Sequence, residues 1–389
     1  MNNINKYFRF RFISRGEVAN KLTQISVKSL QHCHPGILLT VIDANDIPQL
    51  KVEDFPEVHL VHIIPCNDEI AQRVGRGSRK HIFYWRHSPV VLSAIPADTE
   101  FAVYVDSDII FIRPMDLSSL VDLLRMGRIA VAVDESLITY TNLIQERTNL
   151  IKSILNVPGA CGPLLQTGLI FCNNNNNGIF FGEFWRLAKI AANENMLDLL
   201  PFDDMTLLTL LLTSGGKFWD RWLPLSPEWN FITVVGQDPG VFAVGAHYGG
   251  YKAKNLLLEN PEQFTIINSA EFAWGSVANE FKNDKWYFRR GVIPGLLEDK
   301  SVIYELDSPF ALSSVCLNEN QSFRFSVKVI QGVLENIFIF VDGKLHSQLN
   351  NKEWHKSYQK FSIDGGGVVT LIAPTVNSNI NKVVIRIEL

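Results

Sequence analysis

Over the first 290 or so positions of the chain, hydrophobic residues follow two alternating patterns. Short apolar or β-branched runs predict strands, and longer stretches with apolar residues at helical spacing predict helices. Strands that alternate with helices predict an α/β fold, a mainly parallel sheet with helices on both faces, which binds ligands at the carboxyl ends of its strands. The predicted strands are 7–13, 37–43, 58–64, 101–106, 129–133 and 169–172, and the predicted helices are 17–32, 79–95, 117–126, 179–192 and 204–213.

The pattern changes near residue 300, where helical spacing stops. The remaining apolar runs are short and alternating or β-branched, and turn signals such as Asp342-Gly343 separate them. They predict a small antiparallel β-sandwich, with strands at 302–306, 322–330, 336–341, 368–373 and 382–388. A cluster of Gly291, Pro294 and Gly295 marks the boundary, so we expect an α/β domain over 1–295 and an accessory β-sandwich over 296–389. The run of five asparagines at 173–177 is expected to be a solvated turn.

Composition narrows the classes of partner. Hydrophobic residues make up 47% of the 389 positions, enough for a full core, and the formal net charge of -4 provides no basic field for a polyanion. Nucleic acid is therefore not an expected partner. The sequence shows neither a signal peptide nor an apolar run long enough for a transmembrane segment, and its five scattered cysteines lack the spacing of a zinc site. We expect reduced thiols and a cytoplasmic protein.

The strongest local signal lies between residues 101 and 114. An apolar strand runs into Asp106-Ser107-Asp108, continues as an apolar segment and ends at Pro114. Carboxylates flanked by core residues need a counterion, and a hard divalent cation suits them. Because two aspartates at this spacing are common, a strand-end turn with exposed side chains is the alternative.

This segment resembles the metal-binding Asp-x-Asp motif of glycosyltransferases with the GT-A fold. From Tyr7 to about Tyr251 the chain is similar to glycosyltransferase family 8, the group of glycogenin and galactinol synthase. The resemblance implies a GT-A sheet and transfer of a sugar from a nucleotide sugar, with UDP as the expected nucleotide, Mn²⁺ or Mg²⁺ as cofactor, and retention of anomeric configuration. A glycan, a glycolipid or a protein would be the acceptor. Whether the protein forms a homo-oligomer stays open.

A second matching segment, 246–252, resembles the family's His-x-x-Gly-x-x-Lys-Pro-Trp. The resemblance implies that His247 joins Asp106 and Asp108 as a metal ligand, while Gly250 and Lys252 lie at the diphosphate. This sequence departs from the pattern, because Lys252 comes one residue early, Lys254 comes one residue late, and the Pro-Trp is missing. The identity of the diphosphate lysine is therefore open.

The other matching segments supply further candidates. The helix expected at 79–95 would bring Tyr84 and Arg86, with Asp106 and Ser107, to the sugar nucleotide. Gln166-Thr167-Gly168 looks like the family's Asn-Ala-Gly, and Gly168 would permit close backbone approach. Acidic residues at 203 and 204 resemble an Asp-Gln-Asp element, although they also suit a helix start. The expected catalytic set near the donor sugar is Asp134, Gln166, Asp203 and Asp204.

Two other functions remain open on the sequence. A nucleotidyltransferase on a related scaffold would need a Gly- and Arg-rich phosphate loop, of which Ser14-Arg15-Gly16 is a weak version. A non-catalytic sugar-binding protein would retain the cavity without turnover. The intact aspartate pair and His247 argue against the sugar-binding alternative, provided that the three residues meet in space.

Overall fold

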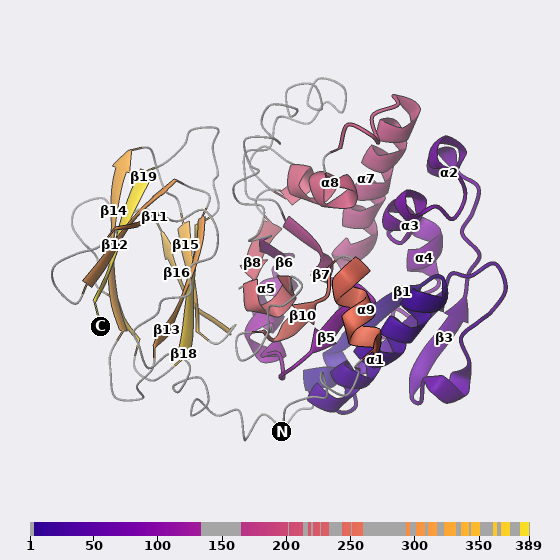
Figure 1. Cartoon of the computed structure of the whole chain (residues 1–389), viewed down its shortest axis with the longest axis horizontal. Helices are drawn as coiled ribbons and strands as arrows, with labels where there is room; N and C mark the ends of the chain where they lie inside the picture. The colour runs from indigo at the N-terminus through magenta and orange to yellow at the C-terminus, as the bar shows by residue number, and fades with distance from the viewer. Residues whose placement is uncertain are drawn as a thin grey trace.

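A computed structural model gives the structure of the chain (Figure 1). It describes residues 4–133, 165–200, 202–212, 217–218, 221–225, 227–232, 243–249 and 251–259, and the strands of the C-terminal region named below.

A seven-stranded sheet forms the centre of the α/β part, in the order β3-β2-β1-β4-β7-β6-β8. Strand β7 is antiparallel to β4 and β6, and the other neighbours are parallel. The predicted mainly parallel sheet is therefore confirmed. The strands are β1 (Phe8–Ser14), β2 (Leu38–Asp43), β3 (Val58–His62), β4 (Phe101–Val105), β6 (Ile129–Val133), β7 (Leu165–Asn173) and β8 (Trp222–Leu225).

Both faces of this sheet are covered. Alternate residues of β1 point to opposite faces, so Phe10 packs edge-on against Phe171 on one face, while Arg11 contacts Phe181 on the other. Helix α7 covers the second face, and α1 lies on the first with α9 beside it (Figure 1). The helices are α1 (Glu17–Cys33), α2 (Glu69–Val74), α3 (Arg79–Trp85), α4 (Pro89–Ser93), α5 (Val121–Arg125), α7 (Asn174–Asn193), α8 (Asp203–Leu212) and α9 (Tyr251–Glu259).

Two local predictions are wrong. The single helix expected at 79–95 is two helices, because Ser88 caps α4 through its side chain and Pro89 occupies the first position of that helix. The asparagine run is not a solvated turn. Asn173 ends β7 and caps α7, accepting a hydrogen bond from Asn175 N at 2.8 Å, and the other asparagines form the first turn of the helix.

A separate three-stranded sheet has the order β5 (Ile109–Phe111), β10 (Gly245–His247) and β9 (Phe231–Ile232). Strand β10 covers one edge of β5. Helix α1 covers the other edge with hydroxyl groups: Ser26 Oγ donates to the carbonyl of Ile109, and Phe111 N donates to Ser29 Oγ at 3.0 Å. Side chains of α1 therefore satisfy backbone hydrogen-bonding groups along the edge of β5 that β10 does not cover.

The C-terminal strands form two antiparallel sheets, as the pattern after residue 300 predicts. One has the order β11 (Ile293–Gly295), β12 (Ser301–Asp307), β19 (Lys382–Glu388), β14 (Phe323–Gln331) and β17 (Phe361–Ile363); the other has β13 (Phe310–Cys316), β18 (Gly367–Ala373), β15 (Asn336–Val341) and β16 (Lys344–Asn350). Packing of the two sheets as a sandwich stays a prediction, as does the boundary at 295. Among the described residues, no helix is long and apolar enough to cross a bilayer.

His34 ends α1 and ties it to the chain after β5, since its Nε2 accepts a hydrogen bond from Met115 N at 2.8 Å. Burial lowers the pKa of His34 to about 4 from 6.5. Between these values the unfolded chain binds the proton and the folded chain does not, so stability is full above pH 6.5 and falls as pH drops toward 4, by at most about 3 kcal/mol.

We expect His34→Gln, which retains an acceptor near the Nε2 position, to flatten part of this acid-side loss in urea unfolding measured from pH 7 to 4. His32→Gln on the exposed face of α1 is the control. Equal pH profiles for His34→Gln and the wild type would contradict the assignment.

Candidate functional site

Three backbone hydrogen bonds hold the turn that carries Asp106 and Asp108. Asp106 N donates to Gly168 O of β7 at 2.8 Å, and Ile109 N donates back to Asp106 O at 3.2 Å. The carbonyl of Asp108 accepts from Tyr248 N, next to β10, at 2.9 Å. The backbone of the turn is therefore held between the central sheet and the three-stranded sheet, at the carboxyl end of β4.

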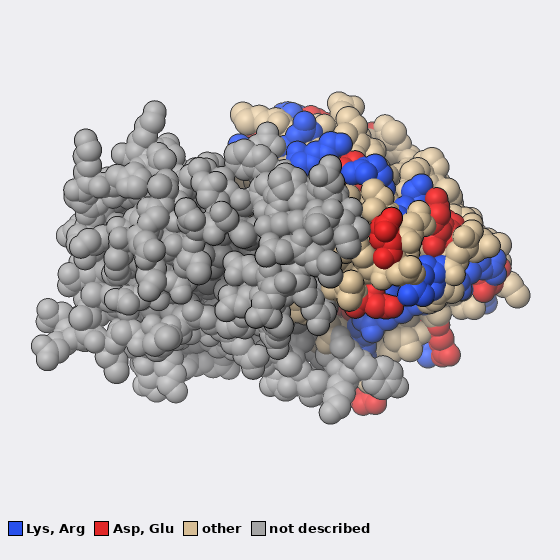
Figure 2. Space-filling view, turned by 90° about the horizontal axis from the view of Figure 1, so that it is seen from above, with Lys and Arg blue, Asp and Glu red and all other residues tan. Residues whose placement is uncertain are grey.

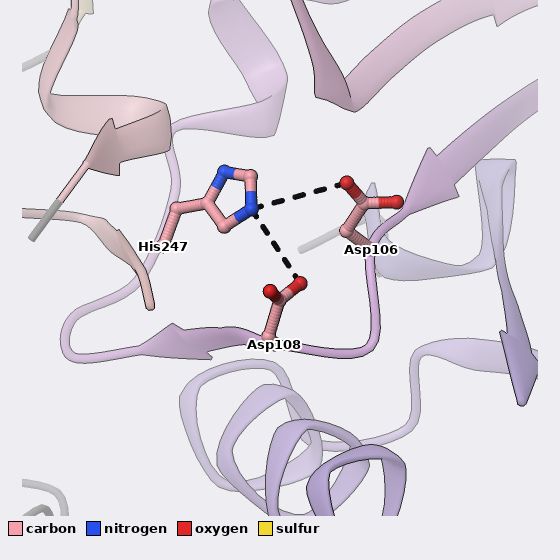
Figure 3. A group of neighbouring side chains, drawn as sticks. All are labelled: Asp106, Asp108 and His247. Carbon is pink, nitrogen blue, oxygen red and sulfur yellow. Dashed lines mark ion pairs between the residues drawn. The ribbon is translucent and has the colours of Figure 1, made fainter. Parts of the chain in front are cut away.

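His247 meets both aspartates across this turn (Figure 3). Its Nε2 lies 3.5 Å from Asp108 Oδ1 and 3.9 Å from Asp106 Oδ2. One ligand atom from each of the three residues lies within 4.8 Å of the others. Two carboxylate oxygens and one imidazole nitrogen at this spacing suit a divalent cation of the manganese or magnesium type, and the nitrogen favours manganese. The three residues thus fit the predicted metal.

Asn230 orients the ring of His247. Its Oδ1 lies 3.0 Å from His247 Nδ1, so a proton on Nδ1 is donated to the amide and Nε2 faces the aspartates. Gly168 makes room for both side chains, because a Cβ at this position would lie 2.9 Å from His247 Cε1 and 3.1 Å from Asn230 Nδ2. The close backbone approach predicted for Gly168 is therefore made to the histidine.

The charges of the site act on each other. Burial alone would raise the pKa of Asp108, but the positive charges of His247 and Lys254 outweigh burial and hold the pKa well below its usual range. Burial would lower the pKa of His247, and the charge of Asp108 reverses that and raises it. The aspartate is thus ionised at neutral pH and available as a ligand.

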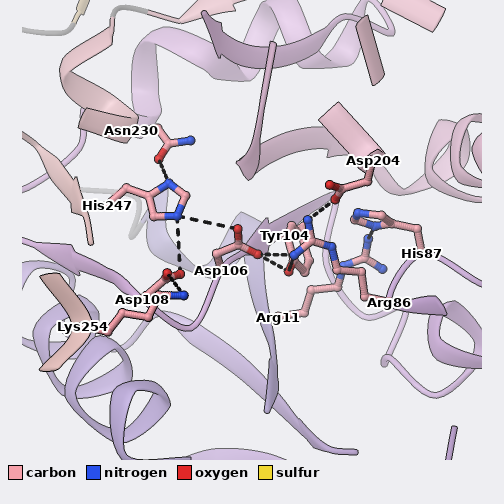
Figure 4. A network of polar contacts seen from close by, with 10 residues as sticks. All are labelled: Arg11, Arg86, His87, Tyr104, Asp106, Asp108, Asp204, Asn230, His247 and Lys254. Carbon is pink, nitrogen blue, oxygen red and sulfur yellow. Dashed lines mark hydrogen bonds and ion pairs between the residues drawn. The ribbon is translucent and has the colours of Figure 1, made fainter. Parts of the chain in front are cut away.

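Arg86 joins Asp106 to the start of α8 (Figure 4). Its guanidinium forms ion pairs with Asp106 Oδ1 and with Asp204, and donates to the Tyr104 hydroxyl at 2.7 Å. Tyr104 in turn donates to the same Asp106 oxygen. The second oxygen of Asp106 is left facing His247. Arg86 therefore sets the orientation of a candidate metal ligand from behind.

A second arginine lies deeper in the core behind this network. The Arg11 guanidinium is buried, lies 4.7 Å from the centre of the Phe181 ring and contacts His87 Nδ1 at 3.4 Å (Figure 4). Burial lowers its pKa to about 10. Its charged neighbour Arg86 lowers the pKa further, whereas the nearby Tyr104 and Cys172 oppose that shift.

The two acids at the start of α8 differ in environment. Asp204 is buried against Arg86; burial raises its pKa to about 6, although Arg86 opposes that shift. Asp203 is 30% exposed and forms an ion pair with Lys80 at 3.4 Å, and burial raises its pKa too. Asp203 also has a left-handed backbone, with φ of 43°. A strained, partly exposed carboxylate at a cavity is the arrangement expected of a reactive group.

A cavity of about 660 Å³ opens beside these residues. Its lining includes eight of the predicted site residues: Arg86, Asp106, Ser107, Asp108, Gln166, Asp203, Asp204 and His247. Tyr84 does not join them. It is fully buried in α3, and its hydroxyl has no hydrogen-bond partner among the described residues. Asp134 and Gly250 lie outside the described residues, as does the side chain of Lys252.

The sequence left open whether Lys252 or Lys254 contacts the diphosphate, and the structure describes the side chain of Lys254. Its Nζ is 2.6 Å from Asp108 Oδ2, and the side chain lines the cavity. Sequence reasoning missed Tyr104 as a ligand-orienting residue, because it reads as an ordinary core position of β4. It also missed the cavity positions of Arg79 and Phe83, whereas Arg15 had entered only as part of a weak phosphate-loop signal. Arg79 and Phe83 lie about one helical turn apart in α3, and an arginine at that distance from an aromatic residue carries no distinctive signal.

The outer surface agrees with the modest net charge. On the face shown in Figure 2, Lys and Arg are interspersed with Asp and Glu across the coloured part of the molecule. On the coloured part of this face, acidic and neutral residues interrupt the basic ones, which is not the continuous basic area that a polyanion needs.

No family model matches the chain, and no curated protein matches it. Among solved structures, it is similar to the galactosyltransferase LgtC in complex with donor and acceptor sugar analogs, with 16% identity and a TM-score of 0.44 over 67% of this chain and 98% of that chain. An active-site mutant of LgtC matches at 15% identity and a TM-score of 0.43, over the same shares of both chains. Mouse xyloside xylosyltransferase 1 matches at 12% identity and a TM-score of 0.37, over 59% and 88%. These low identities and TM-scores assign no role to any residue of this chain.

We expect Gly168→Ala to weaken binding of Mn²⁺ by about tenfold or more, because the new methyl group displaces His247. The measurement is a calorimetric or paramagnetic-resonance titration. Gly182→Ala in α7, where a Cβ meets no atom within 4 Å, is the matched control and should bind Mn²⁺ like the wild type. Unchanged affinity in Gly168→Ala would count against His247 as a ligand.

Arg86→Met should lower the free energy of unfolding by about 3–5 kcal/mol, because it leaves the buried Asp204 and the partly buried Asp106 without their cation. Arg186→Met removes an exposed arginine from an ion pair with Glu183 and should cost less than about 1 kcal/mol. Denaturant unfolding of both variants compares the costs, and similar values would show that the Arg86 network contributes little.

Proposed function

We propose that the protein is a metal-dependent glycosyltransferase that uses a nucleotide sugar. One observation carries this proposal: His247, which is far from Asp106 and Asp108 in the sequence, meets both of them beside a cavity at the carboxyl end of a parallel strand, with Lys254 adjacent. The three residues would hold a divalent cation. When bound, such a cation stabilises negative charge on a departing diphosphate.

The residues around the cation site divide into two groups. Lys254 would contact the diphosphate as a second source of positive charge. Arg86 and Tyr104 keep Asp106 in one orientation, and Asn230 does the same for His247. Preorganised charges of this kind lower the barrier without rearranging during the reaction.

The cavity would also accept the donor sugar. Gln166 and Asp203 both line the cavity, and a sugar hydroxyl can donate to a carboxylate or accept from an amide. Of the predicted acids, Asp203 is the better candidate to face the reacting carbon, since Asp204 is buried and paired with Arg86. We infer transfer with retention from the family resemblance of the His247 segment, together with UDP as the nucleotide and Mn²⁺ as the metal.

The acceptor would enter from the open side of the cavity. A glycan, a glycolipid or a protein that presents a sugar or hydroxyl would each fit this chemistry. The two antiparallel sheets of the C-terminal region are candidates for acceptor binding, because the pattern of their strands is that of an accessory domain.

The central test is hydrolysis of UDP-sugars with Mn²⁺, with and without EDTA. Asp108→Asn keeps the size of the side chain and removes its charge, so we expect at least about a 100-fold loss of turnover with the melting temperature retained. Asp122→Asn on the exposed face of α5 is the matched control. Near-normal turnover in Asp108→Asn would refute the assignment.

Two other outcomes identify the alternatives. Binding of a glycan with no turnover of any donor would indicate a sugar-binding protein. Release of pyrophosphate from a nucleoside triphosphate and a sugar phosphate would indicate a nucleotidyltransferase.

A further inference from the structure

The two aspartates of the site are each held by a cation, but the two cations differ in freedom. Asp106 Oδ1 pairs with Arg86, and Asp108 Oδ2 pairs with Lys254 at 2.6 Å (Figure 4). In both residues the other oxygen faces His247. Both carboxylates can therefore offer one oxygen to a divalent cation while the second oxygen keeps a protein partner.

Arg86 is fixed in its position. Its side chain is 6% exposed and pairs with two carboxylates from different elements, so moving it would leave the buried Asp204 and the partly buried Asp106 without their cation. A bound metal beside Asp106 would leave these contacts in place.

Lys254 is free to move. Its side chain is 26% exposed, lines the cavity and forms an ion pair with Asp108 alone among the contacts that the structure describes. A lysine stem rotates easily, and its ammonium is a point charge with no preferred fork geometry. A divalent cation at Asp108 Oδ1 would withdraw the negative charge that attracts Lys254 and would repel the ammonium.

We propose that Lys254 exchanges between two anions, Asp108 and the diphosphate of the nucleotide sugar, and thereby couples binding of the metal to binding of the nucleotide. This inference rests on the proposed function. The metal weakens the hold of Asp108 on Lys254, and the diphosphate then provides a new partner for the released ammonium. Each ligand thus strengthens the other beyond their direct contact.

The other cations of the cavity lining are less suited to this exchange. Arg15 pairs with Asp46 at 3.3 Å and donates to the carbonyl of Ala44. Arg79 stacks on the Phe83 ring, with its guanidinium carbon 5.0 Å from the ring centre. Within the part of the chain that the structure describes, neither arginine pairs with Asp106 or Asp108, whereas Lys254 already contacts a candidate metal ligand.

The exchange predicts effects of opposite sign in one variant. Lys254→Met should bind Mn²⁺ alone about threefold to tenfold more tightly than the wild type, because a competing positive charge is gone. With Mn²⁺ saturating, the same variant should bind UDP about tenfold more weakly, because the diphosphate loses its ammonium partner. A variant that was merely damaged would lose affinity for both.

Two titrations on the full chain measure these quantities: free Mn²⁺ by paramagnetic resonance without nucleotide, and UDP by calorimetry with Mn²⁺ present. Lys21→Met is the matched control, since Lys21 also forms an ion pair at 2.7 Å but on the exposed face of α1. It should leave both affinities unchanged. If Lys254→Met does not fold, Lys254→Gln removes the charge and keeps a polar side chain of similar length.

The outcomes separate the two proposals. Unchanged or weaker Mn²⁺ binding by the variant, or unchanged UDP binding, would overturn the exchange while a wild type that binds Mn²⁺ and UDP together keeps its proposed function. A wild type that binds Mn²⁺ but no UDP would overturn both.

Discussion

The site depends on one electrostatic constraint: two carboxylates stand at the end of a hydrophobic strand, where ionised groups are costly unless cations accompany them. Arg86 and Lys254 each take one oxygen of one aspartate, and the remaining oxygens converge on His247. Without these partners, burial would favour protonation and the aspartates would be poor ligands. The two side chains come from different helices, Arg86 from the end of α3 and Lys254 from α9.

Arg86 is positioned by the C-terminal end of α3. Arg86 ends α3 and projects between β4 and the start of α8, and Ser88 with Pro89 begins a new helix immediately afterwards. The backbone of Arg86 is still helical, and its N–H donates to the carbonyl of Ile82, so the guanidinium leaves α3 from a regular helical position. From there a single arginine pairs with acids from two elements, Asp106 after β4 and Asp204 in α8.

Much of this arrangement was accessible from the sequence, because it depends on local pattern. The strand before Asp106 and the sheet followed from apolar periodicity, and the resemblance of segment 246–252 implied that His247 joins the aspartates. The contacts of Tyr104, Asn230 and Lys254 with the candidate metal ligands did not follow, since each depends on which side chain faces which across strands and helices. Tyr84 shows the same limit: its neighbour Arg86 enters the site, and a difference of two helical positions turns Tyr84 into the core.

The hydroxyl contacts between α1 and β5 have a consequence for how the protein folds. Ser26 reaches the carbonyl of Ile109 across 83 positions of sequence, and Ser29 reaches Phe111 across 82. The strand that leads out of the aspartate turn therefore has a completed edge only after α1 has docked. Contacts this distant in sequence form late and slowly in a folding reaction. Assembly of the cation site and consolidation of the whole α/β domain should thus be a single event, and nascent chains that lack the docked helix would carry the motif without the site.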